Sequence, residues 1–302
     1  MMKRYLNQVK TIYQNGNNII NYLNRATKSN NNSSETIMVS YDFQSGSYIK
    51  QIEKDHDYIN KYTRAIEVVI DSLGVKYQSI VEVGVGDATT LVNLVPKLKN
   101  KPRRIFGFDL AWSRVRYAIW YAKKKGLNNA FLFMGDLFNI PLSDNSIDIV
   151  YTSHSIEPNG GREREALLEL MRVTRKYLIL LEPAYEFSNL KARERIKKNG
   201  YVKNLYTTAI SLGFDVVEHR LLGDNPNQLN PTGLMVIEKK QKGTKSISNP
   251  LRCTITKTPL KLIKNSYFSN KGLLVYPVVD GVPCLLEDNA IIATHFMDDF
   301  KK

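Results

Sequence analysis

Hydrophobic residues change their spacing along the chain, and the change divides the sequence into three segments. In residues 1–72, apolar residues recur three or four positions apart, which is the spacing of one face of an amphipathic helix. This spacing predicts helices within 3–25 and over 48–74. Between them lie a polar run at 27–36, expected to be a linker, and the loop YDFQSGS. The first segment is therefore expected to be a helical extension and lid.

Residues 73–240 carry short apolar runs that alternate with helical stretches. The runs have the length and composition of buried strands. They are SIVEVGVGD, RIFGFDL, AFLFMGDL, SIDIVYTSHS, KYLILLEP, DVVEHRLL and GLMVIEKK, and helices are expected near 89–99, 112–125, 162–174 and 191–212. Such alternation predicts a largely parallel sheet with helices on both faces. Only a loop joins the last two runs, which predicts a closing antiparallel pair.

Residues 241–302 form a third segment. It opens with QKGTKSISNP, a polar and turn-rich run that is expected to be a linker. From Leu251 to about Ala290 the pattern is typical of short strands, in a stretch too short for a large core of its own. We expect a small β-rich module docked on the main domain.

Composition excludes several classes of protein. A chain of 302 residues has room for two domains with sizeable cores. Two cysteines are too few for a disulfide framework or, alone, for a four-thiolate zinc site. No apolar run approaches the ~18–20 residues that span a bilayer, and the first residues lack the apolar stretch of a secretory signal. We therefore expect a cytoplasmic protein without membrane insertion.

The net charge of +14 raises the question of a nucleic-acid partner. The excess is spread over all three segments, and basic clusters at 97–104 and 123–125 fall where helices end. Both clusters are thus expected at the edge of the sheet that lies opposite the ligand cleft. Cations there complement helix dipoles, so nucleic acid is the less favoured partner.

The most specific local motif is VEVGVGDATTL, at the end of the first expected strand. Glu82 closes the strand, and Gly84 and Gly86 allow the backbone to turn sharply close to a ligand. A dinucleotide-binding turn would carry a third glycine where this chain has Thr89, so a pyrophosphate is not favoured there. Asp109 ends the next strand, roughly 20 residues beyond Gly86, where an acid can accept both ribose hydroxyls. The motif indicates a nucleoside-type cofactor.

Together with two later motifs, these residues resemble the class I S-adenosylmethionine-dependent methyltransferases. The later motifs are GDL, which contains Asp136, and the run IPLSDNSIDIVYTSHSIE. The resemblance covers about residues 40–240. It implies an α/β fold with a Rossmann-like sheet, helices on both faces, and S-adenosylmethionine as cofactor. Asp87 and Ala88 stand where many members carry a further glycine or cysteine.

The resemblance also implies roles for individual residues. Gly84 and Gly86 would flank the methionine part of the cofactor, and Asp109 would hold its ribose. Asp136 and the backbone of Leu137 would meet the adenine, and residues 153–155 would line the methyl-transfer cleft. The cofactor-binding residues predicted in this way are Glu82, Gly84, Gly86, Asp109, Leu110, Asp136, Leu137 and Ser153.

His154 is the candidate catalytic residue, because it follows the fourth expected strand, where open α/β sheets place their ligands. A hydroxyl acceptor must lose a proton as it is methylated, and an imidazole with a pKa near ~6.5 suits that task. The alternative is a loop histidine bonded to backbone. Glu157 either orients His154 or satisfies backbone donors in the turn that follows.

Three further side chains are candidates for substrate binding. Tyr41 and Tyr48 flank the YDFQSGS loop and either cover the ligand or pack in a core. Arg162 opens an expected helix on the cleft side, where it can hold an anionic acceptor or be neutralised by neighbouring glutamates.

The C-terminal segment has a resemblance of its own. It is similar to the small zinc-ribbon proteins that activate several tRNA, rRNA and release-factor methyltransferases, across Tyr276, Pro277, Asp280, Gly281, Pro283, Leu285 and Leu286. The first cysteine pair of that family is here Cys253-Thr-Ile-Thr256, and no later Cys or His pair precedes the Tyr-Pro motif. No metal is therefore expected. The resemblance implies a docking module and, through it, a protein partner.

These observations favour a S-adenosylmethionine-dependent methyltransferase. The loop SHSIEPNGG and the strand end EPAYE resemble members found with surface-polysaccharide biosynthesis, which implies O-methylation of a sugar or sugar nucleotide. An RNA or protein methyltransferase is the alternative, supported by the charge and the activator-like tail. A second alternative is a cofactor-binding scaffold without catalysis.

Overall fold

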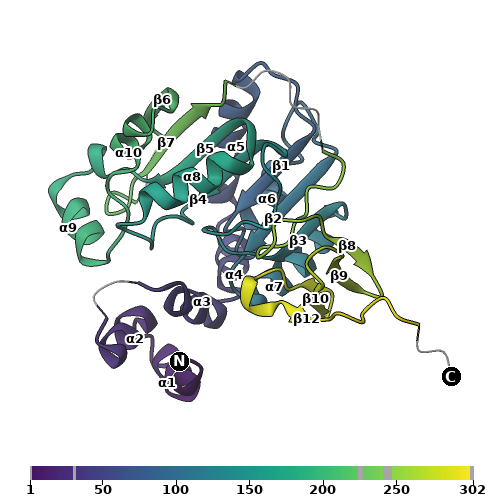
Figure 1. Cartoon of the computed structure of the whole chain (residues 1–302). Coiled ribbons are helices and arrows are strands. Elements are labelled where there is room, and N and C mark those ends of the chain that lie inside the picture. The colour runs from purple at the N-terminus through teal and green to yellow at the C-terminus, as the bar shows by residue number, and fades with distance from the viewer. Residues whose placement is uncertain (1, 30–31, 224–226, 241–246, 300–302) are drawn as a thin grey trace.

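The computed structural model describes residues 2–29, 32–223, 227–240 and 247–299 (Figure 1). Across these residues the central feature is a seven-stranded sheet in the order β3-β2-β1-β4-β5-β7-β6. Its strands are β1 (Ser79–Val83), β2 (Arg104–Asp109), β3 (Ala130–Met134), β4 (Ile147–Ser153), β5 (Thr174–Pro183), β6 (Asp215–Leu221) and β7 (Thr232–Glu238). Strands β1 to β5 pair in parallel, and β7 lies antiparallel between β5 and β6. The predicted Rossmann-like sheet and its closing antiparallel pair are confirmed.

Helices cover both faces of this sheet, which explains why its strands are apolar runs and not alternating patterns. One face packs under α5 (His56–Ser72), α6 (Thr89–Leu94) and α7 (Trp112–Lys124). The other packs under α8 (Glu163–Val173) and α10 (Leu205–Ser211). The middle strands β1 and β4 are therefore buried almost throughout.

The helix expected near 191–212 is wrong as a single element. The structure has the short turn η2 (Tyr185–Phe187) and then α9 (Leu190–Lys198) and α10. Gly200 lies between the two helices in the left-handed region, with φ +65°. That conformation ends the first helix and redirects the chain before the second begins.

The N-terminal residues form η1 (Met2–Tyr5) and the helices α1 (Leu6–Gln14), α2 (Ile19–Thr27), α3 (Ser34–Phe43) and α4 (Ser47–Lys54). Two expectations are corrected. The predicted YDFQSGS loop begins inside α3, and the helix expected over 48–74 is the pair α4 and α5. The break falls at Asp55, whose carboxylate accepts the Tyr58 N–H at 3.0 Å and caps α5. The linker expected at 27–36 includes residues 30–31, which lie outside the described residues.

The C-terminal residues form antiparallel strands beside β3 (Figure 1). They are β8 (Lys261–Ile263), β9 (Ser266–Ser269), β10 (Leu274–Val279), β11 (Val282–Pro283) and β12 (Ile291–Ile292), with a short turn η3 (Glu287–Asn289) before the last. The Leu285 N–H donates to the Met134 carbonyl at 3.2 Å, so the module covers the edge of the large sheet. Leu251 and Tyr276 join the apolar core under α8. Residues 241–246 of the expected linker lie outside the described residues.

Cys253 and Cys284 both lie in the C-terminal segment, where each is a buried free cysteine. The Cys253 sulfur lies 3.1 Å from the Tyr276 hydroxyl, and the Cys284 thiol donates to a backbone carbonyl. Among the described residues, no group of His, Cys, Asp and Glu side chains could hold a metal ion. None of the described helices is long and apolar enough to cross a membrane.

The turn between β1 and α6 fixes the position of the loop after β4. Gly84 has a φ of +68°, and a Cβ added to it would lie 2.2 Å from the Cβ of Ser155. Gly86 and Ala88 continue the turn with φ values of +52° and +60°. Gly84 is thus required both by its backbone conformation and by the contact with the β4 loop.

We predict that Gly84→Ala lowers the free energy of unfolding by about 2–4 kcal/mol, because the new methyl group must displace Ser155 in addition to straining the backbone. Gly126→Ala is the matched control: its φ is +81°, but no atom lies within 4 Å of the added Cβ. That control should lose only about 1–2 kcal/mol, the cost of the left-handed conformation alone. Urea unfolding of both variants measures the difference, and equal losses would contradict the steric argument.

Candidate functional site

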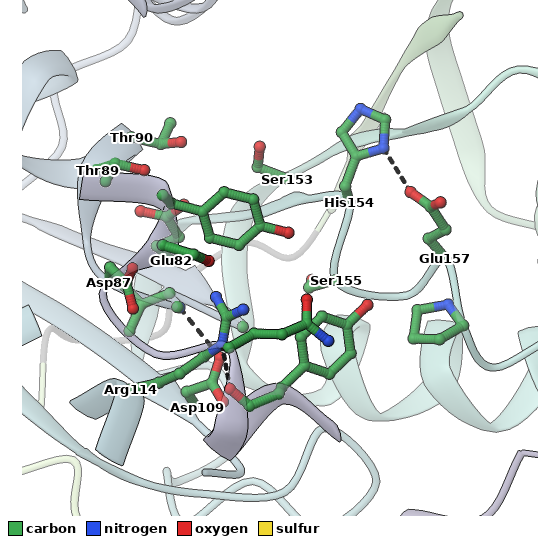
Figure 2. Close-up of a pocket in the computed structure, with 18 of the residues that line it drawn as sticks. Glu82, Asp87, Thr89, Thr90, Asp109, Arg114, Ser153, His154, Ser155 and Glu157 are labelled. Atoms are coloured by element: carbon green, nitrogen blue, oxygen red, sulfur yellow. Dashed lines mark hydrogen bonds and ion pairs between the residues drawn. The ribbon is translucent and has the colours of Figure 1, made fainter. Parts of the chain in front are cut away.

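A cavity of about 1360 Å³ lies at the carboxyl ends of the central strands and extends under the N-terminal helices (Figure 2). It is the place where parallel sheets of this type hold ligands. Most of the predicted site residues line it. They are Tyr41, Tyr48, Glu82, Gly84, Gly86, Asp109, Leu110, Asp136, Leu137, Ser153, His154 and Glu157.

Arg162 is the predicted site residue that does not line this cavity. Its guanidinium pairs with Glu165 at 2.7 Å, as one of the interpretations of the sequence had it. It also lies over the Phe138 ring, 3.3 Å from the ring centre. A role for Arg162 in substrate binding therefore gains no support from its position.

Asp109 ends β2 with its carboxylate fixed by backbone donors. The Gly86 N–H donates to one carboxylate oxygen and the Ala111 N–H to the other, each at 3.0 Å. Each oxygen keeps a lone pair for a further donor. Burial raises the pKa of this carboxyl, and the nearby Arg114 guanidinium partly offsets the rise. The arrangement suits the recognition of two adjacent hydroxyl groups.

Glu82 lies deeper, at the end of β1. The Tyr151 hydroxyl donates to its carboxylate at 2.8 Å. Burial raises the pKa of Glu82 to about 8, although the Tyr151 bond lowers it. The raised pKa makes Glu82 easier to protonate than an exposed carboxyl, and the protonated form could donate a hydrogen bond as well as accept one.

Asp136 and Ser153 complete the wall around the glycine turn. The Phe138 N–H donates to Asp136 at 2.9 Å, and burial raises the pKa of that carboxyl. The Ser153 hydroxyl lies 2.7 Å from the hydroxyl of Tyr62, a residue of α5. Tyr62 also lines the cavity, and the sequence analysis did not single it out.

His154 is held between two side chains. Its Nδ1 lies 2.7 Å from a carboxylate oxygen of Glu157, and its Nε2 lies 2.8 Å from the hydroxyl of Thr232. Asn230 donates to the same Glu157 carboxylate at 3.2 Å. Burial lowers the pKa of His154, but the bond and the charge of Glu157 outweigh it, so the pKa is raised overall. The ring thus bonds side chains and not the backbone, in the arrangement hydroxyl, imidazole, carboxylate.

The loop that carries His154 is fixed by Glu182, at the end of β5. The carboxylate of Glu182 accepts the backbone N–H groups of Ser155, Ile156 and Glu157 at 3.0–3.2 Å. Burial raises the pKa of Glu182 to about 7. This contact, together with a positive φ of +55° at His154, turns the imidazole toward Thr232.

Two functional candidates could not be found from the sequence motifs. Thr232 begins β7, and it reaches His154 only because β7 inserts beside β5. Arg114 lies on α7 and is 2% exposed, and its Nε donates to the Tyr41 carbonyl at 3.0 Å. Its guanidinium lies 4.9 Å and 4.7 Å from the ring centres of Tyr41 and Tyr48. For Arg114, the signal available in the sequence was a charged residue on the apolar side of an amphipathic helix.

Comparison with known proteins is consistent with this geometry. Residues 80–177 match the methyltransferase domain family. The putative methyltransferase YrhH of Bacillus subtilis (strain 168) is 30% identical over 115 residues, which are 37% of this chain and 62% of that protein. The chain thus spans less than two thirds of the length of this curated relative.

Two solved structures share the fold. Magnesium protoporphyrin IX methyltransferase from Synechocystis PCC 6803, with bound S-adenosylmethionine, has a TM-score of 0.50 and 12% identity over 68% of this chain and 97% of that one. The complex of the Haloferax volcanii Trm112 methyltransferase activator with a putative methyltransferase has a TM-score of 0.50 and 17% identity over 66% of this chain and 96% of that one. Residues 80–177 thus match a methyltransferase domain, and the chain shares the fold of these two structures, as the sequence motifs predict.

Proposed function

We propose that the chain is a S-adenosylmethionine-dependent methyltransferase that O-methylates a sugar or sugar nucleotide in surface-glycan biosynthesis. The observation that carries the proposal is the continuity of one cavity. It joins the glycine turn and Asp109, which fit a nucleoside cofactor, to the pair His154 and Glu157, which fits removal of a hydroxyl proton.

The residues present fit S-adenosylmethionine. Asp109 has two oriented oxygens that suit the ribose hydroxyls. Asp136 and Leu137 line the same cavity, and the proposal assigns them to the adenine. The Ser155 hydroxyl is buried without a partner beside the glycine turn, so it has a hydrogen bond to give. The cofactor, when bound, supplies an electrophilic methyl group on its sulfonium.

His154 acts on the acceptor in this proposal. The Nδ1–H donates to Glu157, which fixes the tautomer and leaves Nε2 as the base. An acceptor hydroxyl would replace the Thr232 hydroxyl at Nε2 and would give up its proton to that nitrogen. The acceptor oxygen would take the methyl group as the bond from methyl to sulfur breaks, which would leave S-adenosylhomocysteine as a neutral thioether. Glu157 then balances the imidazolium charge.

The N-terminal helices contribute to the lining of the cavity, which favours a small acceptor over a polymer. Residues of α3, α4 and α5 line it opposite the strand ends. The basic clusters at 97–104 and 123–125 follow α6 and α7 and so lie away from those strand ends. The alternative acceptors are RNA and protein. A protein partner bound through the C-terminal module is a separate part of the proposal. Labelled S-adenosylmethionine, incubated with the purified chain and separate pools of nucleotide sugars, total RNA and protein, tests the proposal. Label in RNA or protein alone would refute the sugar acceptor, and label in none would favour a non-catalytic scaffold.

We predict that Asp109→Ala weakens S-adenosylmethionine binding by about 1–3 kcal/mol, because the ribose hydroxyls lose a charged acceptor. Isothermal calorimetry measures the change. The control is Asp215→Ala, since Asp215 pairs with Lys240 outside the cavity. Unchanged affinity in the Asp109 variant would remove this residue from the cofactor site.

We predict that His154→Ala lowers turnover of a hydroxyl acceptor by ~10²–10⁴ while cofactor affinity changes little. Because Glu157 holds the pKa of His154 above its ordinary value, the base form appears only as pH rises through that raised pKa. Turnover should therefore increase with pH and level off above neutrality, and Glu157→Gln should move the rise to lower pH. His295→Ala is the matched control, because His295 bonds Asp298 at the same 2.7 Å but lies outside the cavity. If the His154 variant keeps its turnover within about threefold of the parent, the loss is far smaller than ~10² and the base role is excluded.

A further inference from the structure

We infer that Asp87 and Arg114 bind the ammonium and the carboxylate of the amino-acid end of S-adenosylmethionine, an inference that rests on the proposed function. Both side chains line the cavity, and they are 1% and 2% exposed. Among the residues that the structure describes, both carboxylate oxygens of Asp87 and the Nη2 of Arg114 are buried without a hydrogen-bond partner. These are two side chains of opposite charge with unused bonding capacity on the lining of one cavity.

Such an arrangement is costly in the absence of a ligand. A buried charge without a partner destabilises a fold, so buried ions normally pair with one another. Within the described part of the chain, Asp87 and Arg114 do not meet in a hydrogen bond. A zwitterion placed between them would satisfy both, because its carboxylate can accept from the guanidinium and its ammonium can donate to Asp87.

The position of the guanidinium supports this assignment. The Nη1 of Arg114 lies 2.9 Å from the point where a Cβ of Gly86 would be, so the guanidinium crosses directly over the glycine turn. Figure 2 shows it pointing into the space bounded by Asp87, Asp109 and Ser155. The amino-acid end of the cofactor is expected against this same turn. The unpartnered Ser155 hydroxyl lies on its other side.

A structural role for Arg114 explains only part of its surroundings. Its Nε holds the Tyr41 carbonyl, and its charge lies against the rings of Tyr41 and Tyr48. These contacts tie α3 and α4 to α7, but they use neither Nη2 nor Asp87. Both residues line the cavity, so a ligand with a positive and a negative group is the partner we assign to these atoms.

The test compares two ligands that differ only at the amino-acid end. S-adenosylhomocysteine carries the ammonium and the carboxylate, whereas 5′-methylthioadenosine keeps the adenosine and the thioether and lacks both charges. Calorimetry on Arg114→Met and Asp87→Asn should show a loss of about 10- to 100-fold in affinity for S-adenosylhomocysteine. Affinity for 5′-methylthioadenosine should stay within about threefold in both variants, because no charged contact is lost.

Controls separate binding from folding. Arg116→Met, on the same helix, removes an exposed guanidinium that pairs with Asp280 and should change neither affinity. Asp87→Asn removes an unpaired buried charge, so its melting temperature should stay the same or rise. If Arg114→Met fails to fold, Arg114→Lys and the isosteric Asp87→Asn carry the test.

The outcomes distinguish this inference from the function on which it rests. If the parent chain binds neither ligand, the proposed function fails. If the parent binds S-adenosylhomocysteine but both variants lose the two ligands equally, the cofactor assignment stands and the charge pairing is overturned. A lower melting temperature of Asp87→Asn with unchanged affinity would likewise make Asp87 a structural residue.

Discussion

The site depends on one buried carboxylate that satisfies the backbone of the loop after β4. Glu182 accepts three successive N–H groups, from Ser155 to Glu157, at the point where the chain leaves the sheet. A buried loop must find partners for its backbone donors, and here a single side chain of the neighbouring strand supplies them. The same contact presses Ser155 against Gly84 and aims His154 at Thr232. The cofactor turn and the candidate base are therefore positioned by one anchor.

The two edge strands of the large sheet, β3 and β6, avoid exposed backbone pairing in different ways. The C-terminal module covers the β3 edge. The β3 edge would expose unpaired backbone groups next to a largely apolar strand, and the module covers it through Cys284 and Leu285. The β6 edge is left open, and it carries the charged Glu218 and Arg220, which discourage pairing with another chain. Tyr276 lies in the same apolar core as residues of α8, so the module packs against the main domain through buried side chains.

Sequence patterns could predict the features that depend on local chemistry. Buried strands are continuous apolar runs, and the glycine turn needs φ values that few other residues adopt, so β1 and Gly84 were identifiable in advance. The position of Asp109 at the end of β2 was predicted from its distance along the chain from Gly86. The helix α3 was missed because its polar residues suggested a loop, whereas Ser33 caps it by accepting the Thr36 N–H. Capping of this kind competes with turn formation in the same residue types.

Contacts between distant segments could not be predicted in this way. Thr232 meets His154 only through the insertion of β7 between β5 and β6, and strand order is not written in any local motif. Arg114 meets Tyr41 only because α3 folds back over α7. In both cases the sequence shows a polar residue in an otherwise apolar context, but the residue that it contacts cannot be predicted from local sequence.

The N-terminal helix α3 is joined by hydrogen bonds to the start of α7, whose Arg114 covers the glycine turn. Asp42 of α3 accepts both the N–H and the hydroxyl of Ser113 at the start of α7, at 2.9 Å and 3.0 Å. Arg114, the next residue, holds the Tyr41 carbonyl with one nitrogen and extends the rest of its guanidinium over Gly86. The two contacts hold α3 against the start of α7, next to the glycine turn that Arg114 covers. A single buried arginine therefore contacts both the N-terminal helices and the glycine turn at the strand ends.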